Sequence, residues 1–340
     1  MSDYSIEPLG VLEGHGGAVT SLACGQNSDG SILLISGSRD KSIIQWELDF
    51  NGKEIIYKDD EGKDQRKVLM GKPYKSFHGH NHFVSSLALN SDSSKLISGS
   101  WDKTIRLWDI PSTKSEKIFK GHTKDVLTVG FSDDERLIFS GGMDNSLIYW
   151  NTLGELKHTN QTFNGWVSCI LNFTKDKKKY IAVGSWDGTV HIFNSDYQPE
   201  RVIRGGEYAV TSLSADEEGE FLFIAYKDGT VKVYNFQIEQ ADQDDEKNFK
   251  YVIETGVDIN CILFETKFFE MFAIGTSKGL QIRRIKVDKK KAKPIVFSDP
   301  KKGKSQACLS LTYDKAKDYL FAGFADGTIK VYKIGAKEES

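Results

Sequence analysis

The sequence predicts an all-β fold, a seven-bladed β-propeller with four antiparallel strands in each blade. Three observations lead to this fold class. A unit recurs with a basic step of 41–43 residues, each unit contains short alternating strand patterns, and no long helical periodicity appears. Seven such units account for the length of 340 residues, so we expect one domain over residues 1–340.

The recurring unit is clearest at a turn that contains an aspartate. The turns read GSRDKSIIQW, GSWDKTIRLW, GGMDNSLIYW, GSWDGTVHIF, AYKDGTVKVY and GFADGTIKVY, and GTSKGLQIRR stands between the last two. Their aspartates are Asp40, Asp102, Asp144, Asp187, Asp228 and Asp326, and Lys278 takes this position in the sixth unit. In these turns the pairs Asp-Gly and Asp-Lys stand between β-branched or aromatic runs, which is typical of hairpin turns.

The remaining strands of each unit flank this turn. The runs KLISGS and TIRLW lie on its two sides in the second unit, and FVSSLAL, VLTVGF and WVSCILNF each predict a strand further upstream. The segment SIEPLGVLEG precedes the first complete unit, and the chain ends shortly after GTIKVYKIG. We therefore expect the N-terminal strand to complete the last blade and close the ring, because this pairing removes two exposed edges.

Three segments interrupt the period. Residues 51–67 hold five acidic and five basic residues and predict a solvated, mobile loop. Residues 239–246 carry five acidic residues and no basic one. Residues 286–304 carry eight lysines against two aspartates; this run either serves solubility or contacts phosphates, and the sequence does not separate the two.

Three units begin with Gly-His, and each histidine has matched partners downstream. A serine stands four residues before the turn aspartate and a tryptophan six residues after it. This pattern resembles the WD-repeat family, which implies a chain of hydrogen bonds from histidine through serine and aspartate to tryptophan in each blade. The three sets are His15, Ser36, Asp40 and Trp46; His80, Ser98, Asp102 and Trp108; and His122, Ser140, Asp144 and Trp150.

Composition limits the classes of function. The formal net charge of −3 gives no overall attraction to nucleic acid or anionic membranes, so any such attraction must be local. No run of about 18 apolar residues is present, which predicts no membrane span. The N-terminus lacks a charged-then-apolar leader, and the four cysteines are scattered through apolar runs. We expect a cytoplasmic protein with reduced, mostly buried thiols.

No catalytic motif stands out. The sequence has no P-loop, no G-x-S-x-G and no H-E-x-x-H. His78, His80 and His82 in HGHNH could suggest a metal, but His80 is already assigned to the blade network. We therefore expect no enzyme, no cofactor, no metal and no small-molecule substrate, and instead a surface that binds macromolecules.

That surface is expected at one rim of the ring. The residue before each turn aspartate should line this rim, together with residues that enter the innermost strands. The expected protein-binding residues are Phe83, Trp101, Met143, Trp166 and Trp186, with Lys227, Ser277, Ala325 and Asp125 also on the rim. We expect Trp101 and Trp186 to be exposed, because they stand in tight turns rather than in mid-strand.

Longer strings narrow the resemblance within this family. GSRDKSIIQW, HFVSSLALNSD, SGSWDKTIRLWD, GHTKDVLTVGFS and LFAGFADGTIKVYKI together are similar to the receptor for activated C kinase family, over essentially the whole chain. The resemblance implies a Gβ-like scaffold on the head of the small (40S) ribosomal subunit, which touches rRNA and neighbouring ribosomal proteins and docks protein kinase C and other signalling proteins. It also implies phosphorylation of a tyrosine near the connection between the fifth and sixth blades, where Tyr251 is the nearest match.

The resemblance assigns the ribosome contact to cations around the first turn aspartate. These are Arg39 and Lys41, and Lys103 and Lys124 occupy the matching turn and a loop of neighbouring blades. Only the first unit places a cation on both sides of its aspartate. Two alternatives stay open, a G-protein β-like subunit and a substrate receptor of a ubiquitin ligase; the first usually has an N-terminal helix, and the second an adaptor-binding segment.

Overall fold

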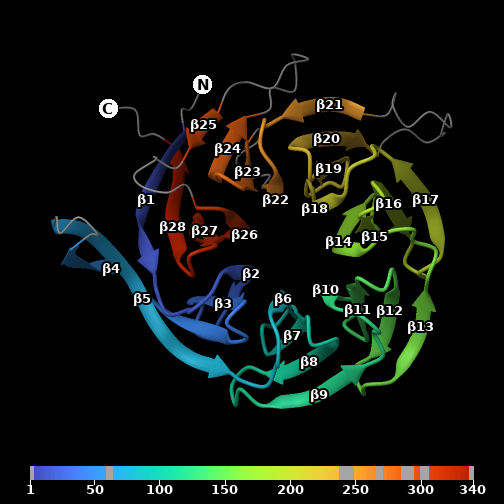
Figure 1. Cartoon of the computed structure of the whole chain (residues 1–340), viewed down its shortest axis with the longest axis horizontal. Helices are drawn as coiled ribbons and strands as arrows, with labels where there is room; N and C mark the ends of the chain where they lie inside the picture. The colour runs from blue at the N-terminus through green and yellow to red at the C-terminus, as the bar shows by residue number, and fades with distance from the viewer. Residues whose placement is uncertain are drawn as a thin grey trace.

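The computed structural model describes residues 4–58, 64–236, 249–264, 271–284, 295–298 and 306–336. Within these residues every regular element is a β-strand. The strands form small sheets arranged radially around a common central axis, referred to below as the channel, as Figure 1 shows. The prediction of an all-β propeller with seven blades of four antiparallel strands is confirmed.

Each blade runs outward from the channel in chain order. Blade 1 consists of β2 (Val19–Gln26), β3 (Ile32–Ser38), β4 (Ile43–Lys58) and β5 (Asp64–Phe77). Blade 2 consists of β6 (Val84–Leu89), β7 (Lys95–Ser100), β8 (Thr104–Asp109) and β9 (Ser115–Lys120). Blade 3 consists of β10 (Val126–Phe131), β11 (Leu137–Gly142), β12 (Leu147–Asn151) and β13 (Leu156–Asn160).

The other blades repeat this order. Blade 4 has β14 (Val167–Lys175), β15 (Lys178–Ser185), β16 (Thr189–Phe193) and β17 (Pro199–Arg204). Blade 5 has β18 (Val210–Ala215), β19 (Phe221–Tyr226), β20 (Thr230–Asn235) and β21 (Phe249–Glu254), and blade 6 has β22 (Ile259–Phe264), β23 (Met271–Thr276), β24 (Gly279–Arg284) and β25 (Ile295–Ser298). Blade 7 has β26 (Cys308–Asp314), β27 (Tyr319–Phe324), β28 (Ile329–Ala336) and the N-terminal β1 (Tyr4–Leu12).

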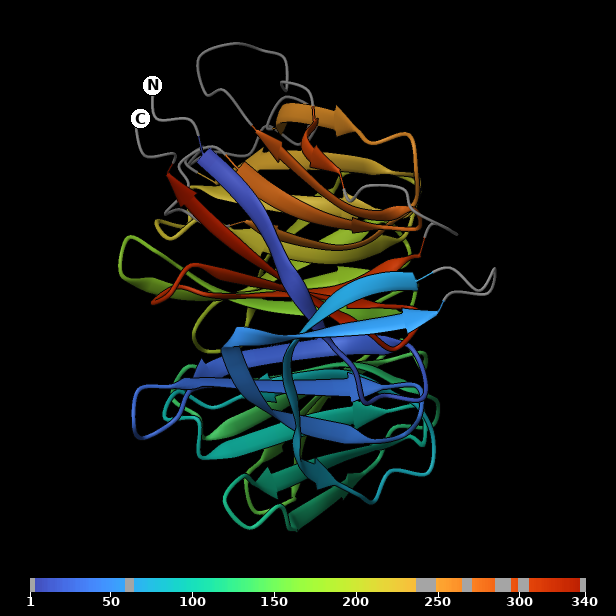
Figure 2. The same ribbon diagram turned by 90° about the vertical axis from the view of Figure 1, so that its left-hand side faces the viewer.

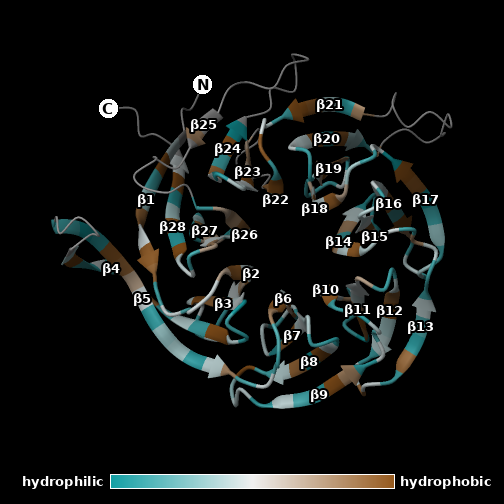
Figure 3. Cartoon of the chain, viewed as in Figure 1, coloured by the Kyte–Doolittle hydropathy of each residue, from teal (hydrophilic) through white to brown (hydrophobic). Residues whose placement is uncertain are grey.

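The core lies between the blades. The second strand of a blade is covered on both faces, so β3 is buried along its whole length and reads as a continuous apolar and small-residue run, ILLISGS. Ile35 and Phe77 of blade 1, for example, share one cluster with Val84 and Trp108 of blade 2. Figure 3 shows the same division, with hydrophobic colour concentrated in the strands and hydrophilic colour in most connecting loops.

Side chains of the innermost strands connect neighbouring blades around the channel. The hydroxyl of Ser85 in blade 2 lies 2.6 Å from the carbonyl oxygen of Val126 in blade 3, and the hydroxyl of Ser168 in blade 4 lies 2.6 Å from that of Val210 in blade 5. Thr20 makes the same contact from blade 1 to blade 2. These bonds satisfy strand edges that would otherwise face the channel.

The ring is closed by the N-terminal strand, as predicted. β1 pairs antiparallel with β28 from Tyr4↔Ala336 to Leu12↔Ile329. It also meets β5 in parallel at Val11↔Leu69, so blades 7 and 1 form one eight-stranded sheet. Figure 2 shows β4 and β5, in light blue, lying across the end of β1.

The prediction of a loop at residues 51–67 was wrong for the residues described there. β4 and β5 continue as a hairpin that pairs from Lys53↔Leu69 to Lys58↔Asp64. The physical reason is that apolar side chains anchor the base of this hairpin: Val68 packs on the core between blades 7 and 1, and Phe50 stacks on Tyr319 with ring centroids 4.2 Å apart. Residues 239–246, and residues 286–304 apart from β25, lie outside the described residues.

Candidate binding surface

One backbone hydrogen bond recurs at the rim in all seven blades. The residue before the turn aspartate, or before Lys278 in blade 6, donates its N–H to the carbonyl oxygen of the residue that precedes the innermost strand. These N···O distances are 2.8–3.0 Å. The pairs are Arg39 with Ala18, Trp101 with Phe83, Met143 with Asp125, Trp186 with Trp166, Lys227 with Ala209, Ser277 with Asp258 and Ala325 with Ala307. Two loops of each blade therefore present their side chains side by side on one face.

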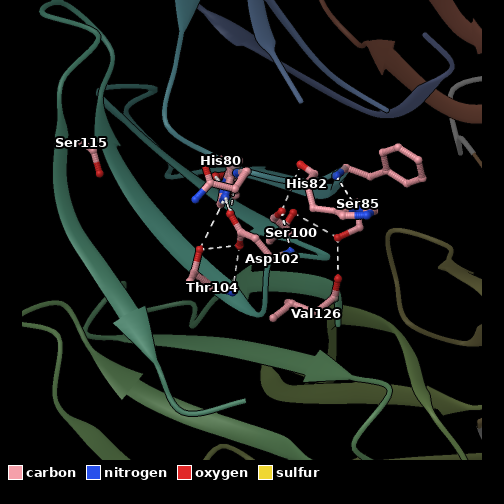
Figure 4. Close-up of polar contacts among 12 residues, drawn as sticks. His80, His82, Ser85, Ser100, Asp102, Thr104, Ser115 and Val126 are labelled. Atoms are coloured by element: carbon pink, nitrogen blue, oxygen red, sulfur yellow. Dashed lines mark hydrogen bonds and ion pairs between the residues drawn. The ribbon is translucent and has the colours of Figure 1, made fainter. Parts of the chain in front are cut away.

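The tetrad of blade 2 holds these loops in place, and Figure 4 shows two of its members, His80 and Asp102, beside Thr104. The indole Nε1–H of Trp108 donates to Ser98 Oγ at 2.8 Å, and Ser98 lies 2.7 Å from His80 Nε2. Because an indole can only donate, the serine hydroxyl accepts from Trp108 and donates to the imidazole. His80 Nδ1–H then donates to Asp102 Oδ2 at 2.8 Å. All four residues are connected, and Ser98 is fully buried.

Blades 1 and 3 repeat this geometry. His15 Nδ1 lies 2.8 Å from Asp40 Oδ2, and Trp46 Nε1 lies 2.7 Å from Ser36 Oγ. In blade 3 the distances are 2.9 Å from His122 Nδ1 to Asp144 Oδ2, 2.8 Å from His122 Nε2 to Ser140 Oγ and 2.8 Å from Trp150 Nε1 to Ser140 Oγ. The structure thus brings together all twelve residues of the three predicted sets.

The turn aspartates are held in their charged form. Burial alone would raise the pKa of Asp102, but hydrogen bonds from His80 and Thr104 outweigh it and hold this pKa well below its usual range. The pKa of Asp40 is lowered in the same way, against burial, by His15 and Ser42. These carboxylates accept several structural hydrogen bonds each, so they are fixed parts of the turn rather than acid–base groups.

Blade 4 replaces the tetrad with an apolar set. The N–H of Asn164 donates to Asp187, as the N–H of Asn81, which follows His80, does to Asp102. Phe163 therefore takes the place of the histidine, and it shares one buried cluster with Val183 and Phe193, at the serine and tryptophan positions. The polar tetrad of blades 1 to 3 and the apolar set of blade 4 differ in chemistry but support the same turn.

The rim encloses a cavity of about 280 Å³ at the mouth of the channel. Its wall is built from equivalent positions of the seven innermost strands: Thr20, Ser85, Leu127, Ser168, Thr211, Asn260 and Leu309. Its edge is formed by Arg39, Phe83, Trp101, Trp186 and Lys227. Of the expected protein-binding residues, Met143 and Trp166 lie on the rim but do not line this cavity.

The aromatic rim residues are packed in two groups. Trp101 is half-buried, because it stacks on His82 at 5.7 Å between ring centroids and touches Phe83 at 5.2 Å. The prediction that Trp101 is exposed was therefore wrong. Trp186 is 43% exposed and stacks on Trp166 with centroids 4.2 Å apart.

Four cations of blades 1–3 are exposed on this face: Arg39, Lys41, Lys103 and Lys124. None of them forms an ion pair with a carboxylate among the described residues. The guanidinium carbon of Arg39 lies 5.7 Å from the centre of the Phe83 ring, which directs this side chain toward the channel mouth. The patch is therefore a locally positive area on a chain of negative net charge.

Lys41 and Lys103 occupy a backbone conformation that other blades give to glycine or asparagine. Their φ angles are 74° and 70°, and the equivalent residues are Asn145 and four glycines in blades 4 to 7. An L-residue other than glycine is strained in this left-handed region. The fold alone does not favour lysine at these two positions.

The remaining predicted residues fall outside this surface. Tyr251 lies in β21, where it pairs with Val233 and packs half-buried against the core between blades 5 and 6. His80 and His82 of HGHNH have separate roles, in the tetrad and in the stack on Trp101. In the described part of the chain, no group of three or more His, Cys, Asp or Glu side chains could hold a metal ion. No helix there is long and apolar enough to cross a membrane.

Two of the cysteine thiols, those of Cys24 and Cys169, are poor nucleophiles. Burial raises the pKa of Cys24 to about 12, with a smaller contribution from the charge of Asp314. Burial also raises the pKa of Cys169 to about 12. Both thiols are therefore protonated at neutral pH.

Sequence reasoning missed two features of this face. The hydroxyl bonds between blades made by Thr20, Ser85 and Ser168 left no motif beyond a single Ser or Thr at the second position of the innermost strand. The second neighbour of β1 was missed because the charges of residues 51–67 hide a strand alternation, visible in EIIY and KVLM.

The fold and the tetrads define a class, the WD-repeat propellers. The family described as "WD domain, G-beta repeat" matches residues 6–47, 71–109, 113–151, 154–194 and 197–235, more than half of the chain. The small ribosomal subunit protein RACK1 of Caenorhabditis elegans is 36% identical over 342 residues, covering 99% of both chains. That of Drosophila melanogaster is 37% identical over 97% of this chain and 98% of its own. Cross-pathway control WD-repeat protein 2 of Flammulina velutipes is 35% identical over 98% of this chain and 99% of its own. This chain belongs to the RACK1 family of WD-repeat proteins.

Proposed function

We propose that this protein is a non-catalytic scaffold bound to the head of the small ribosomal subunit in the cytoplasm, where it links signalling proteins such as protein kinase C to translation. The observation that carries the proposal is the patch of Arg39, Lys41, Lys103 and Lys124, exposed and without carboxylate partners among the described residues. Relatives along the whole chain carry the name small ribosomal subunit protein, which supports an rRNA contact at this patch.

The chemistry of the patch suits a phosphate backbone. Arginine can donate two parallel hydrogen bonds to phosphate oxygens, and lysine adds a point charge. The backbone around these cations is fixed by the tetrads and by the N–H of Arg39 bonded to the carbonyl of Ala18 at 2.9 Å. A rigid, locally positive rim recognises the shape and charge of folded RNA rather than its base sequence.

Co-sedimentation with small subunits tests the proposal. We expect Arg39→Asp combined with Lys41→Glu to leave the fold intact and to release the protein from the subunit. Lys177→Asp combined with Lys178→Glu is the matched control, because it makes the same charge change at exposed residues at the opposite end of a blade. Unchanged co-sedimentation of the Arg39/Lys41 variant, or equal release of the control, would contradict the assignment.

The signalling role belongs to the part of the same face away from the patch. On blade 4 the half-buried Trp166 and the exposed Trp186 form a stacked aromatic pair, and Lys227 stands on the rim of blade 5. Aromatic side chains in this setting are typical of protein-binding hot spots. A protein held on RNA through blades 1–3 therefore keeps blades 4 and 5 available for other proteins.

A further inference from the structure

We propose that the cavity at the channel mouth binds an acidic linear peptide of a protein partner, with an apolar side chain in the mouth and a carboxylate at its edge. This inference rests on the protein-binding half of the proposed function. It names the chemistry of the partner, which the family assignment does not supply. The cavity shares Arg39 with the cationic patch, but the other three cations of the patch, Lys41, Lys103 and Lys124, do not line it.

The positive charge at the edge of the cavity favours an anionic ligand. Arg39 and Lys227 stand on blades 1 and 5, and the described lining contains no carboxylate. Lys227 also lies 3.3 Å from Asp258, but both side chains are about half exposed, and an ammonium group has three donors. A carboxylate between the two blades can therefore be approached by cations from opposite sides.

The rings beside these cations select an apolar neighbour for that anion. Trp101 and Phe83 line one side of the cavity and Trp186 lines the other. Stacking on Trp166 fixes Trp186 in place, and packing against His82 and Phe83 fixes Trp101. Rigid aromatic walls bind an aliphatic or aromatic side chain with little loss of conformational entropy.

The wall below the mouth keeps the anion at the edge. The hydroxyls of Ser85 and Ser168 lie 2.6 Å from carbonyl oxygens of the next blade and donate their hydrogens to them. Leu127 and Leu309 complete the wall with apolar surface. An anion deeper in the channel would therefore meet acceptors and hydrocarbon rather than donors.

A peptide fits these features better than single-stranded RNA. RNA would also find cations and aromatic rings here, but it needs a continuous basic track for its backbone. On the rim, Asp125 and Asp258 stand beside Met143 of blade 3 and Ser277 of blade 6 and interrupt such a track. A volume of about 280 Å³ accommodates one or two side chains of an extended chain.

A library of random nine-residue peptides on phage tests this inference. It is selected on the wild-type protein and on Lys227→Glu, with Lys178→Glu as a control of equal charge change at an exposed residue away from the rim. We expect wild type and Lys178→Glu to enrich sequences with an acidic residue next to an aliphatic or aromatic one, and Lys227→Glu to lose this enrichment. The enriched peptide, labelled with fluorescein, should bind Lys227→Gln and Trp186→Ala at least ten-fold more weakly than wild type by anisotropy.

Three results would overturn the inference: no acidic enrichment, equal binding to wild type and both cavity variants, or tight binding of a fluorescein-labelled U12 RNA that Lys227→Glu abolishes while no peptide is enriched. Circular dichroism of each variant shows whether it folds, and Lys227→Gln keeps the test valid if Trp186→Ala does not. Co-sedimentation with small subunits tests the cationic patch separately. Lys227→Glu should still bind small subunits, so failure of the peptide site and failure of the ribosome assignment give different results.

Discussion

Removing the hydroxyl of Ser98 should destabilise blade 2 far more than the size of the change suggests. This oxygen accepts from Trp108 at 2.8 Å and lies 2.7 Å from His80 Nε2, and both of these rings are buried. Ser98→Ala leaves a buried indole N–H and a buried imidazole nitrogen without their partner, at about 1–3 kcal/mol each. We therefore expect the free energy of unfolding to fall by about 2–6 kcal/mol.

Blade 4 supplies the second half of this prediction. There Phe163, Val183 and Phe193 occupy the three positions with apolar side chains. Replacing the histidine, serine and tryptophan together leaves the turn aspartate with the N–H of Asn81 and the hydroxyl of Thr104, the same kinds of donor that Asp187 has in blade 4. Such a replacement is close to neutral when the shapes fit. The triple variant His80→Phe, Ser98→Val, Trp108→Phe should therefore cost clearly less than the sum of its three single substitutions.

Guanidinium denaturation followed by far-UV circular dichroism measures both effects, because this signal does not depend on Trp108. Ser115→Ala on the outer strand of the same blade is the control, since its hydroxyl makes only a 3.5 Å contact at the surface. The reasoning is refuted if Ser98→Ala costs no more than Ser115→Ala. It is also refuted if the costs in the triple variant simply add.

Three further outcomes are expected. Lys41→Gly should raise the free energy of unfolding by about 1 kcal/mol by relieving the left-handed backbone, and weaken small-subunit binding; a loss of stability in denaturation would contradict this. The folded-state pKa values of Asp40 and Asp102 are lowered, so their contribution to stability is present above about pH 4 and lost as pH falls below it. The denaturation midpoint should fall with pH in the same range, and Asp102→Asn should make this fall smaller. Gly10→Ala should cost about 1–3 kcal/mol, because a Cβ there would lie 2.3 Å from the carbonyl oxygen of Val68, and deletion of residues 1–12 should cost more in the same assay.

The blades could be predicted because their signals are local and repeated. A turn aspartate, an aromatic residue six positions later and short alternating strands are visible in almost every unit. Ring closure followed from counting the strands at the two ends of the chain. These inferences need only hydrogen-bond chemistry within a blade and the cost of an exposed edge.

The binding surface was predictable only in part. The repeat placed Arg39, Trp101, Trp186 and Lys227 on one rim, since equivalent turns lie on one face. It did not reveal which side chains face the channel mouth, because that depends on contacts between blades such as the stack of Trp101 on His82. The strain at Lys41 was likewise invisible, since a lysine in a turn has no sequence signature of a positive φ.

The position of β1 between β28 and β5 has a consequence for the order in which the chain folds. Pairing with β28 joins residues near both ends of the chain, as at Leu12↔Ile329, and must wait until the last blade has been synthesised. The contact Val11↔Leu69 closes a much shorter loop, whose entropic cost is lower by about 1.5 kcal/mol. The ion pair of Lys67 with Glu13, at 2.7 Å, strengthens the same crossing. The N-terminal strand can thus be held against blade 1 early in synthesis, already in place when the seventh blade arrives, so its free edge is sheltered during the period when it could pair with other chains.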